Sequence, residues 1–326
     1  MNKKLLITGG AGFIGSVLTA YLLDHGYEVV VVDDLSTGHS RTIDSRASFI
    51  QASILDKAAL VEALAGVNTV IHCAAKSLVE ESVSSPELYH QVNTEGTRVL
   101  LEAMNEAGVL NIIFSSTAAV YGDSKIQPLT ESSEIKPVNP YGKSKIEAER
   151  LIPTLCRDGF AGITFRYFNV AGSYQSSTGQ LHVEDHKNET HLIPKIMKNY
   201  IKNKEKAQVE IYGDSWPTKD GSCIRDYLHV VDLAAAHLLA LNALEAGINK
   251  VFNLGSGSGY SVFEVVNEIE KVVEGKLSRV ITPNRPGDPA VLLADIDKAR
   301  KELGWIPKAN LNQIIFDSWQ GAKQLG

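Results

Sequence analysis

Short apolar runs alternate with longer amphipathic stretches through the first half of the chain. This alternation is typical of a parallel sheet covered by helices on both faces, because strands buried on both sides are apolar throughout. The expected strands span residues 4–8, 28–33, 47–52, 69–75, 111–117 and 162–169. One expected helix ends near His25, and a second spans residues 56–65. A third runs from an N-cap at Ser85 to about Gly108, and a fourth contains Tyr141. The pattern predicts an α/β fold with a doubly wound parallel Rossmann sheet.

After about residue 170 the pattern becomes less regular. The expected elements are loops at 173–189 and 214–221, helices at 191–206, 231–245 and 262–273, and strands at 209–213 and 250–254. The helix at 231–245 should return to the first domain. We therefore predict a large Rossmann domain of residues 1–170 with about 226–249, and a smaller discontinuous α/β domain of residues 171–225 and 250–326 that closes over the crevice.

A glycine-rich turn joins the first strand to the first helix, where residues 9–15 have the sequence GGAGFIG. Gly9 allows the tight turn, Gly12 lets the backbone approach a pyrophosphate, and Gly15 allows close packing of helix on strand. Free N–H groups and the dipole at a helix N-terminus favour an anion there. The turn therefore indicates a dinucleotide site, although its spacing differs from the commoner Gly-x-Gly-x-x-Gly.

The second strand ends in Asp33, about eighteen residues after Gly15. A carboxylate at this point can accept hydrogen bonds from the adenosine ribose hydroxyls and would repel a 2′-phosphate. NAD is therefore favoured over NADP. Asp34 is the alternative acid, and the nearby Arg41 is the residue that would instead favour NADP.

Tyr141 and Lys145 lie four residues apart and should share one face of a helix. A phenol normally titrates near ~10 and is a poor base at neutral pH. A lysine ammonium one turn away should lower the pKa of the phenol by favouring the phenolate. The pair could then take a proton from an alcohol.

Charge and cysteine usage exclude several classes of protein. The net charge is −6 with both signs well mixed, which argues against a nucleic-acid partner. Cys73, Cys156 and Cys223 are far apart and odd in number, so we expect a reducing cytoplasm and no disulfide or zinc framework. The histidines show no metal-ligand spacing and are expected to be structural. The apolar run at the amino end stops at Gly9, so neither a signal peptide nor a membrane span is expected.

With these residues and SST at 115–117 in place, the chain resembles the extended short-chain dehydrogenase/reductase family, and more narrowly the UDP-glucose (UDP-galactose) 4-epimerases. The narrower likeness rests on RYFN at 166–169, DGSCIRDYLHV at 220–230, NLG at 253–255 and RPGD at 285–288. It covers nearly the whole chain.

This resemblance implies an isomerase of galactose and nucleotide-sugar metabolism that interconverts UDP-glucose and UDP-galactose with tightly bound NAD. In such enzymes the tyrosine takes the proton of the sugar 4-hydroxyl while C4 gives hydride to NAD, and both return after the 4-keto sugar has turned over. Tyr141 would be the base, Thr117 would help relay the proton, and Lys145 would also hold the nicotinamide ribose.

The resemblance also implies binding residues. NAD would contact Gly9, Gly12, Phe13, Ile14, Gly15, Asp33, Ser53, Ile54, Cys73, Ala74, Ala75, Asn93, Ser115, Tyr141, Lys145, Tyr167 and Phe168. The UDP-sugar would contact Thr117, Asn169, Leu192, Tyr212, Arg225, Arg285, Asp288 and Leu292. The two arginines would clamp the diphosphate, because phosphates leaving water need paired cations. The alternative for each arginine is an ion pair with an acid such as Asp226 or Asp288. Tyr212 could instead have a packing role, and Asn93 could instead lie on a helix surface.

Three positions depart from the family pattern. Ser53 stands where an acid usually meets the adenine amine, and Ser77 stands where some members have a lysine, with Lys76 beside it. Leu292 stands where strict glucose/galactose enzymes have a bulky tyrosine. A smaller residue would leave room for an N-acetyl group, so UDP-GlcNAc and UDP-GalNAc stay within the expected substrates.

Other hypotheses differ in class. A nucleotide-sugar dehydratase would need Asp-Glu directly after the active-site threonine, where this chain has Ala118 and Ala119. A 4-epimerase of UDP-glucuronate or a UDP-pentose would differ only by small changes in the pocket. A non-catalytic NAD-binding regulatory protein would tend to lose the tyrosine. The family also implies a homodimer, formed through the helices that start near Ser85 and Tyr141.

Overall fold

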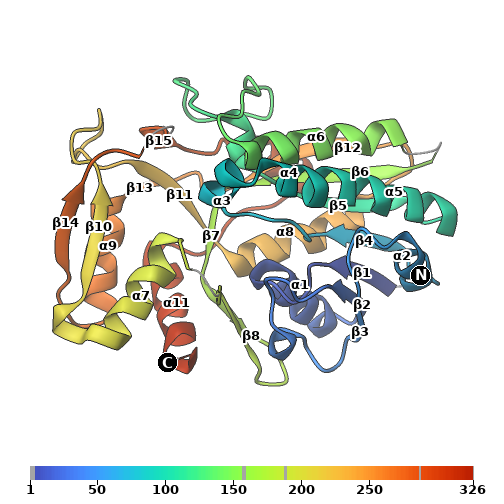
Figure 1. Ribbon diagram of the computed structural model, residues 1–326, viewed down its shortest axis with the longest axis horizontal. Coiled ribbons are helices and arrows are strands. Elements are labelled where there is room, and N and C mark those ends of the chain that lie inside the picture. Colours follow the sequence, from blue (N-terminus) through green and yellow to red (C-terminus); the bar gives the residue numbers. More distant parts are fainter. Residues whose placement is uncertain (1–3, 156–158, 187–188, 286–287, 326) are drawn as a thin grey trace.

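The computed structural model describes residues 4–155, 159–186, 189–285 and 288–325. Its larger part is a seven-stranded sheet in the order β12-β6-β5-β4-β1-β2-β3, and all neighbouring strands are parallel (Figure 1). The strands are β1 (Lys4–Thr8), β2 (Glu28–Asp33), β3 (Ser48–Gln51), β4 (Thr69–His72), β5 (Asn111–Thr117), β6 (Ala161–Tyr167) and β12 (Asn249–Leu254). The predicted doubly wound parallel sheet is confirmed.

Helices cover both faces of this sheet, as alternation of the strand side chains requires. Leu5 and Ile7 of β1 pack in one apolar cluster with the helices α1 and α8, whereas Leu6 packs in another cluster with α2, α5 and α6. The helices are α1 (Phe13–Asp24), α2 (Lys57–Ala63), α5 (Gly96–Ala107), α6 (Pro140–Leu155) and α8 (Val230–Ala243). The helix predicted at 231–245 therefore does return to the large sheet.

The smaller part packs three helices against a parallel pair of strands (Figure 1). The strands are β10 (Gln208–Tyr212) and β14 (Ser278–Thr282), and the helices are α7 (Leu192–Asn203), α9 (Val262–Val272) and α11 (Leu311–Leu325). Met197, Val266 and Ile315 are fully buried in this second core. A capping box of Ser261 and Glu264 starts α9.

A short sheet joins the two parts. The central strand β11 (Ile224–His229) pairs with β7 (Asn169–Ala171), which follows β6, and with β13 (Gly259–Ser261) and β15 (Val291–Leu292). The buried carboxylate of Asp226 accepts hydrogen bonds from the backbone N–H groups of Ser256, Gly257 and Ala294. This short sheet fixes β11 and β15 beside β7, which continues from the carboxyl end of β6.

Three expectations need correction. Residues 173–189 contain a hairpin of β8 (Ser173–Gln175) and β9 (Leu181–Val183). The helix expected at 85–108 is divided into α4 (Pro86–Tyr89), a π-helical turn (His90–Glu95) and α5. A further helix, α3 (Val79–Ser84), precedes it, and the Ser85 side chain does not cap α4. Strand 249–254 belongs to the large sheet, because its full length pairs with β6, although we placed residues from 250 onward in the smaller domain.

The remaining elements are short. They are α10 (Asp297–Leu303) and 3₁₀ turns at Ser40–Thr42, Ala118–Tyr121 and Lys204–Lys206. In the described ranges, no helix combines the length and the apolar character needed to cross a lipid bilayer. Cys73 and Cys223 are free, and Cys156 lies outside the described residues.

Candidate active site

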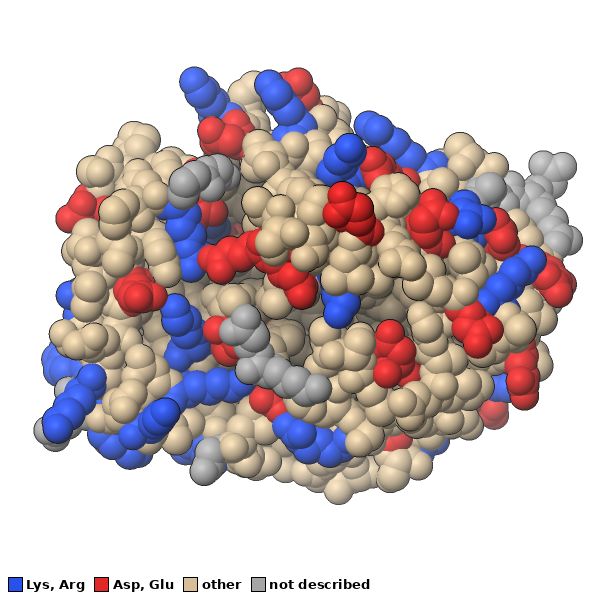
Figure 2. Space-filling model, in the orientation of Figure 1, with Lys and Arg blue, Asp and Glu red and all other residues tan. Residues whose placement is uncertain are grey.

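A cavity of about 1090 Å³ lies at the carboxyl ends of the central strands, between the two parts. Figure 2 shows the surface hollowed in this region, with acidic and basic side chains at the rim. A pocket for one small ligand usually has ~300–1,000 Å³, so this space suits two adjoining ligands. Every predicted cofactor and substrate residue except Asn93 lines it.

The glycine turn forms one end of the cavity. Gly9 has a φ of +73°, and a Cβ on it would lie 2.6 Å from the backbone nitrogen of Ala74. A Cβ on Gly15 would lie 2.1 Å from the carbonyl oxygen of Gly9. Gly12 is the N-cap of α1, and in the described structure no side chain caps this helix and no acid lies in its first turn. The exposed N–H groups therefore fit a pyrophosphate.

Asp33 is held at the end of β2 by two backbone groups. Its Oδ2 accepts from Ala11 N at 3.0 Å and its Oδ1 from Leu35 N at 2.8 Å. Burial raises the pKa of this carboxyl, and the two N–H groups oppose the shift. Asp34 is exposed and accepts from the next loop instead, and Arg41 is ion-paired with Asp185. The geometry favours Asp33 as the acid that faces a ribose.

Asn93 is neither on a helix surface nor on the cavity wall. It is 1% exposed, and its amide accepts from Lys76 N at 2.8 Å and donates to Lys76 O at 2.9 Å and to Ser144 Oγ at 2.9 Å. Asn93 thus ties the loop after β4, which carries the cavity-lining Lys76 and Ser77, to α6. The Ser53 hydroxyl is also locally engaged and accepts from Leu55 N at 3.2 Å.

Three elements bring the predicted catalytic residues together. Tyr141 and Lys145 line the cavity from the first turns of α6, and Thr117, at the end of β5, hydrogen-bonds the phenol. Lys145 is 3% exposed, and its Nζ lies 4.4 Å from the centre of the Phe114 ring. The Tyr89 ring packs edge-on against Tyr141 at 6.3 Å. The reactive groups are therefore held by packed side chains.

The protonation of this pair differs from the expectation. Burial raises the pKa of Tyr141, and only the hydrogen bond with Thr117 opposes it. Burial also lowers the pKa of Lys145 to about 8, against the opposing effects of Cys73 and Glu149. Without ligands, Lys145 does not bring the phenol below its ordinary range. A further positive charge beside Tyr141 would be needed to favour the phenolate.

A buried ion pair supports the catalytic face of α6. Glu149, two turns after Tyr141, receives a bidentate contact from Arg166 of β6 at 3.1 and 2.8 Å, and a hydrogen bond from Ser116. Arg166 also donates to the Tyr121 hydroxyl at 3.0 Å. Sequence reasoning missed Glu149, although the spacing 141, 145, 149 continues along one helix face.

A chain of buried hydrogen bonds runs from the cavity wall into α8. Cys73 Sγ lies 3.2 Å from Ser115 Oγ. The Tyr167 hydroxyl lies 2.9 Å from the same Ser115 oxygen and 2.7 Å from His237 Nε2. His237 Nδ1 lies 2.9 Å from the Leu233 carbonyl and must donate to it. Nε2 is therefore the acceptor, and the Tyr167 hydroxyl donates to it. His237 was not anticipated from the sequence.

Arg225 lies on β11, the central strand of the short sheet that joins the two parts. Its Nη1 donates to the carbonyls of Ile224 and Pro289 at 2.9 and 2.8 Å, and its Nη2 lies 3.6 Å from Asp288. Leu292 is its neighbour on β15 in the parallel register. The expected clamp and the expected gate of the sugar pocket are thus adjacent. Asp226, the alternative partner, is occupied by backbone N–H groups.

Arg285 forms the outer edge of the cavity. Its guanidinium lies 3.8 Å from the centre of the Tyr212 ring, and its Nη2 is 3.7 Å from the carboxylate of Glu80 on α3. This pair spans the cavity from one part of the molecule to the other. Sequence reasoning did not identify Glu80, because only the tertiary fold brings α3 opposite Arg285. The two residues that follow Arg285 in the RPGD motif lie outside the described residues.

Comparison with known proteins gives consistent results. Residues 5–255 match the family described as NAD dependent epimerase/dehydratase. The UDP-glucose 4-epimerase of Corynebacterium glutamicum is 43% identical over 325 residues, with 99% of this chain and 97% of that protein covered. The Bifidobacterium longum UDP-glucose 4-epimerase, solved in complex with NAD+ and UDP, has a TM-score of 0.90 and 35% identity, with 98% and 99% of the two chains covered. The UDP-Glc/GlcNAc 4-epimerase of Campylobacter jejuni has a TM-score of 0.82 and 35% identity, at 98% and 99% coverage.

Proposed function

This chain belongs to the NAD dependent epimerase/dehydratase family, and we propose that it interconverts UDP-glucose and UDP-galactose by inverting the sugar at C4. One observation carries the proposal. Thr117, Tyr141 and Lys145 meet on the wall of a cavity whose one end suits a dinucleotide and whose other end carries Arg225 and Arg285. Three relatives that are 41–43% identical over 97–99% of this chain are UDP-glucose 4-epimerases.

NAD is the cofactor that the site fits. When bound, it supplies a reversible hydride acceptor for C4. The N–H groups of the glycine turn would bind its pyrophosphate, and the carboxylate of Asp33 would accept from the adenosine ribose. Lys145 would donate to the second ribose, at the bottom of the cavity.

Tyr141 accepts the proton of the sugar 4-hydroxyl in this proposal, and Thr117 orients that hydroxyl. The raised pKa of Tyr141 has a consequence for timing. Burial disfavours the phenolate in the ligand-free site, so the positively charged nicotinamide ring of bound NAD would supply the charge that favours the base. Proton removal is thereby favoured in the assembled complex.

The charged end of the cavity would hold the nucleotide while the sugar turns over. Arg225 and Arg285 would bind the diphosphate, with Asn169 as a further contact, and Leu192 and Tyr212 would enclose the uracil. Asp288 would accept from the uridine ribose. The diphosphate must displace Glu80 from Arg285, so the ion pair across the cavity opens when substrate binds.

Two neighbouring positions argue against dehydratase activity. Ala118 and Ala119 begin the 3₁₀ turn directly after Thr117. Neither side chain can move a proton, whereas elimination of water needs an acid and a base. Oxidation at C4 in this site would therefore be followed by re-reduction.

Acetamido sugars fall within the proposal. Leu292 lines the cavity beside Arg225, where a tyrosine would fill the space next to the sugar C2. The Campylobacter jejuni relative is an epimerase of UDP-Glc and UDP-GlcNAc. We therefore include UDP-GlcNAc and UDP-GalNAc as substrates, with UDP-galactose as the first to test.

The assembled form and the location belong to the same proposal. We infer a cytoplasmic homodimer in which the adjoining helices α5 and α6 of each copy form the interface. The free Cys73 and Cys223 suit a reducing compartment. Light scattering of the purified protein tests the dimer, and a monomer at micromolar concentration would refute it.

Turnover of UDP-galactose by purified protein, with no NAD added, tests the function. UDP-glucose should appear, because the cofactor is expected to remain bound through purification. Conversion only after NAD is added would point to loose retention, with Ser53 and Ser77 as the first residues to restore. No conversion of UDP-galactose or the other UDP-sugars in either condition would overturn the proposal.

A further inference from the structure

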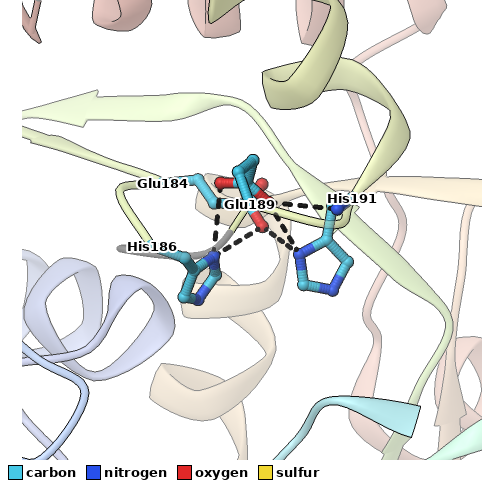
Figure 3. Close-up of side chains that lie close together, drawn as sticks. All are labelled: Glu184, His186, Glu189 and His191. Carbon is cyan, nitrogen blue, oxygen red and sulfur yellow. Dashed lines mark hydrogen bonds and ion pairs between the residues drawn. The ribbon is translucent and has the colours of Figure 1, made fainter. Parts of the chain in front are cut away.

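Two glutamates and two histidines meet on the segment that joins β9 to α7. Glu184, His186, Glu189 and His191 point their carboxylate oxygens and ring nitrogens at one another (Figure 3). Four ligand atoms, one from each residue, lie within 4.8 Å of one another. We expected the histidines of this chain to be structural, and nothing in the chemistry at C4 uses this cluster.

The spacing of these atoms matches a tetrahedral metal site. His186 Nδ1 lies 3.5 Å from Glu184 and 3.4 Å from Glu189, and His191 Nδ1 lies 2.8 Å from Glu184 and 3.3 Å from Glu189. Ligands at the usual Zn–N and Zn–O distances of ~2.0–2.1 Å are about 3.3 Å apart along each edge of a tetrahedron. The two Glu189 distances involve different oxygens of that carboxylate, so one ligand atom per residue accounts for three of the six edges. Two of these three are already close to the required length.

Two buried atoms in the cluster lack a hydrogen-bond partner. They are His186 Nδ1 and Glu189 Oε2, counted against all partners in the described part of the chain. The Glu189 side chain is 7% exposed, and its Oε2 has only long contacts, at 3.4 Å to His186 and 3.7 Å to Lys198. An unpartnered buried carboxylate oxygen is costly, so a ligand for it is expected.

The surrounding charges leave room for a cation. Asp185, the one neighbouring acid, is shared by Arg41, His39 and Lys198. Among the described residues, Lys198 is the one lysine or arginine that forms an ion pair with a member of the cluster, at 3.7 Å from Glu189. With both imidazoles neutral, the two glutamates carry two negative charges, which a divalent ion would balance.

We propose that Glu184, His186, Glu189 and His191 bind a divalent transition-metal ion of the Zn²⁺ class. Two imidazoles with two carboxylates select zinc, cobalt or nickel over magnesium or calcium, which prefer oxygen ligands alone. Four protein ligands fill a tetrahedral shell, so the ion is structural and has no open position for catalysis.

The ion would stabilise the wall of the substrate cavity. His191 is the N-cap of α7, and the next residue, Leu192, is the expected uracil contact. Glu184 directly follows β9. The metal would therefore connect a hairpin that packs beside α11 to the helix that faces the nucleotide.

Zn²⁺ alone, titrated into full-length protein that has been treated with a chelator, tests the proposal. Calorimetry should give one ion per chain, and the unfolding temperature should rise with Zn²⁺ but not with Mg²⁺ at the same concentration. Co²⁺ should give the intense visible absorption of a tetrahedral complex. No saturable binding, or equal stabilisation by Mg²⁺, would overturn the proposal. The readout needs no turnover, so the outcome is separate from that of the epimerase assay.

Variants locate the ion. His186→Gln and His191→Gln should each weaken Zn²⁺ binding by at least the ~10–100-fold that loss of an outer-shell partner costs. His39→Gln is the matched control, because His39 contacts Asp185 of the same segment but is not a ligand, and it should bind as the unaltered protein does. The His186 side chain is 27% exposed and that of His191 is 45% exposed, so if His186→Gln fails to fold, the more exposed His191→Gln still decides the question. Unchanged affinity in either variant would place the ion elsewhere and contradict the proposal.

Discussion

The two ends of the cavity are built in different ways. The end that faces the cofactor uses backbone N–H groups and fully packed side chains, such as Lys145 at 3% and Asn93 at 1% exposure. The end at which we propose that the nucleotide binds has long charged side chains, and Arg285 and Asp288 are 37% and 39% exposed. An epimerase needs both kinds of construction, because hydride and proton transfer require fixed positions while the sugar must turn over between them.

Loss of the phenol should produce the largest effect, because it removes chemistry from the rigid end. We expect Tyr141→Phe to lower kcat by about 10²–10⁴-fold, the usual contribution of a positioned acid/base group. The bound NAD and the unfolding temperature should stay as they are. Tyr89→Phe is the matched control, because its ring packs on Tyr141 while its hydroxyl, among the described residues, hydrogen-bonds Leu78 and Glu81. Steady-state kinetics of the two variants checks this, and a near-normal rate for Tyr141→Phe would refute the base assignment.

Ion pairs should behave differently at the two ends. Glu149→Gln leaves the Arg166 guanidinium buried without its carboxylate and should lower the free energy of unfolding by ~3–5 kcal/mol. Lys195→Gln breaks the exposed pair with Glu210 and should cost less than about 1 kcal/mol. Urea denaturation of both proteins measures the contrast. Equal losses in the free energy of unfolding would show that the buried pair of Glu149 and Arg166 stabilises the protein no more than an exposed pair does.

Substrate choice should depend on one residue of the nucleotide end. Leu292→Tyr should lower activity on UDP-GlcNAc relative to UDP-galactose by about 10–200-fold, the range that a small group in a pocket contributes. Activity on UDP-galactose should persist, because the residue lies on β15, apart from Tyr141 and Lys145 on α6. The ratio of kcat/KM values for the two sugars measures the effect, and an unchanged ratio would exclude Leu292 as the gate.

The buried lysine should make stability depend on pH. Burial lowers the pKa of Lys145 to about 8, so between this pH and the ordinary ~10.4 only the unfolded chain holds the proton. Cofactor-free protein should therefore gain up to about 1.4 kcal/mol of stability per pH unit in this window, relative to Lys145→Met. Below pH 8 the difference should be flat. Lys143→Met, whose side chain is 71% exposed, should show no such gain. Urea unfolding at a series of pH values tests this, and a flat difference above pH 8 would contradict it.

The same contrast explains what could be predicted from the sequence. The glycine turn, Asp33 and the pair on α6 are local patterns, and all of them line the cavity. Glu80 and Glu149 become neighbours of their partners only through tertiary packing. Glu184, His186, Glu189 and His191 lie within eight consecutive residues, and their spacing was overlooked. The hairpin of β8 and β9 was missed because its strands have three residues each.

The raised pKa of Tyr141 could not be predicted from spacing alone. The charge of Lys145 was expected to decide it, but burial of both side chains has the larger effect. Burial is a property of the folded chain, and no local motif reports it.

The account depends most on the claim that C4 is oxidised and re-reduced within one closed site. UDP-galactose with deuterium at C4 can be given to the purified protein in ordinary water, without added NAD, and followed by NMR and mass spectrometry. The account predicts UDP-glucose that keeps its deuterium at C4, because a hydride held in the site does not exchange with solvent. Loss of the label to water would contradict it.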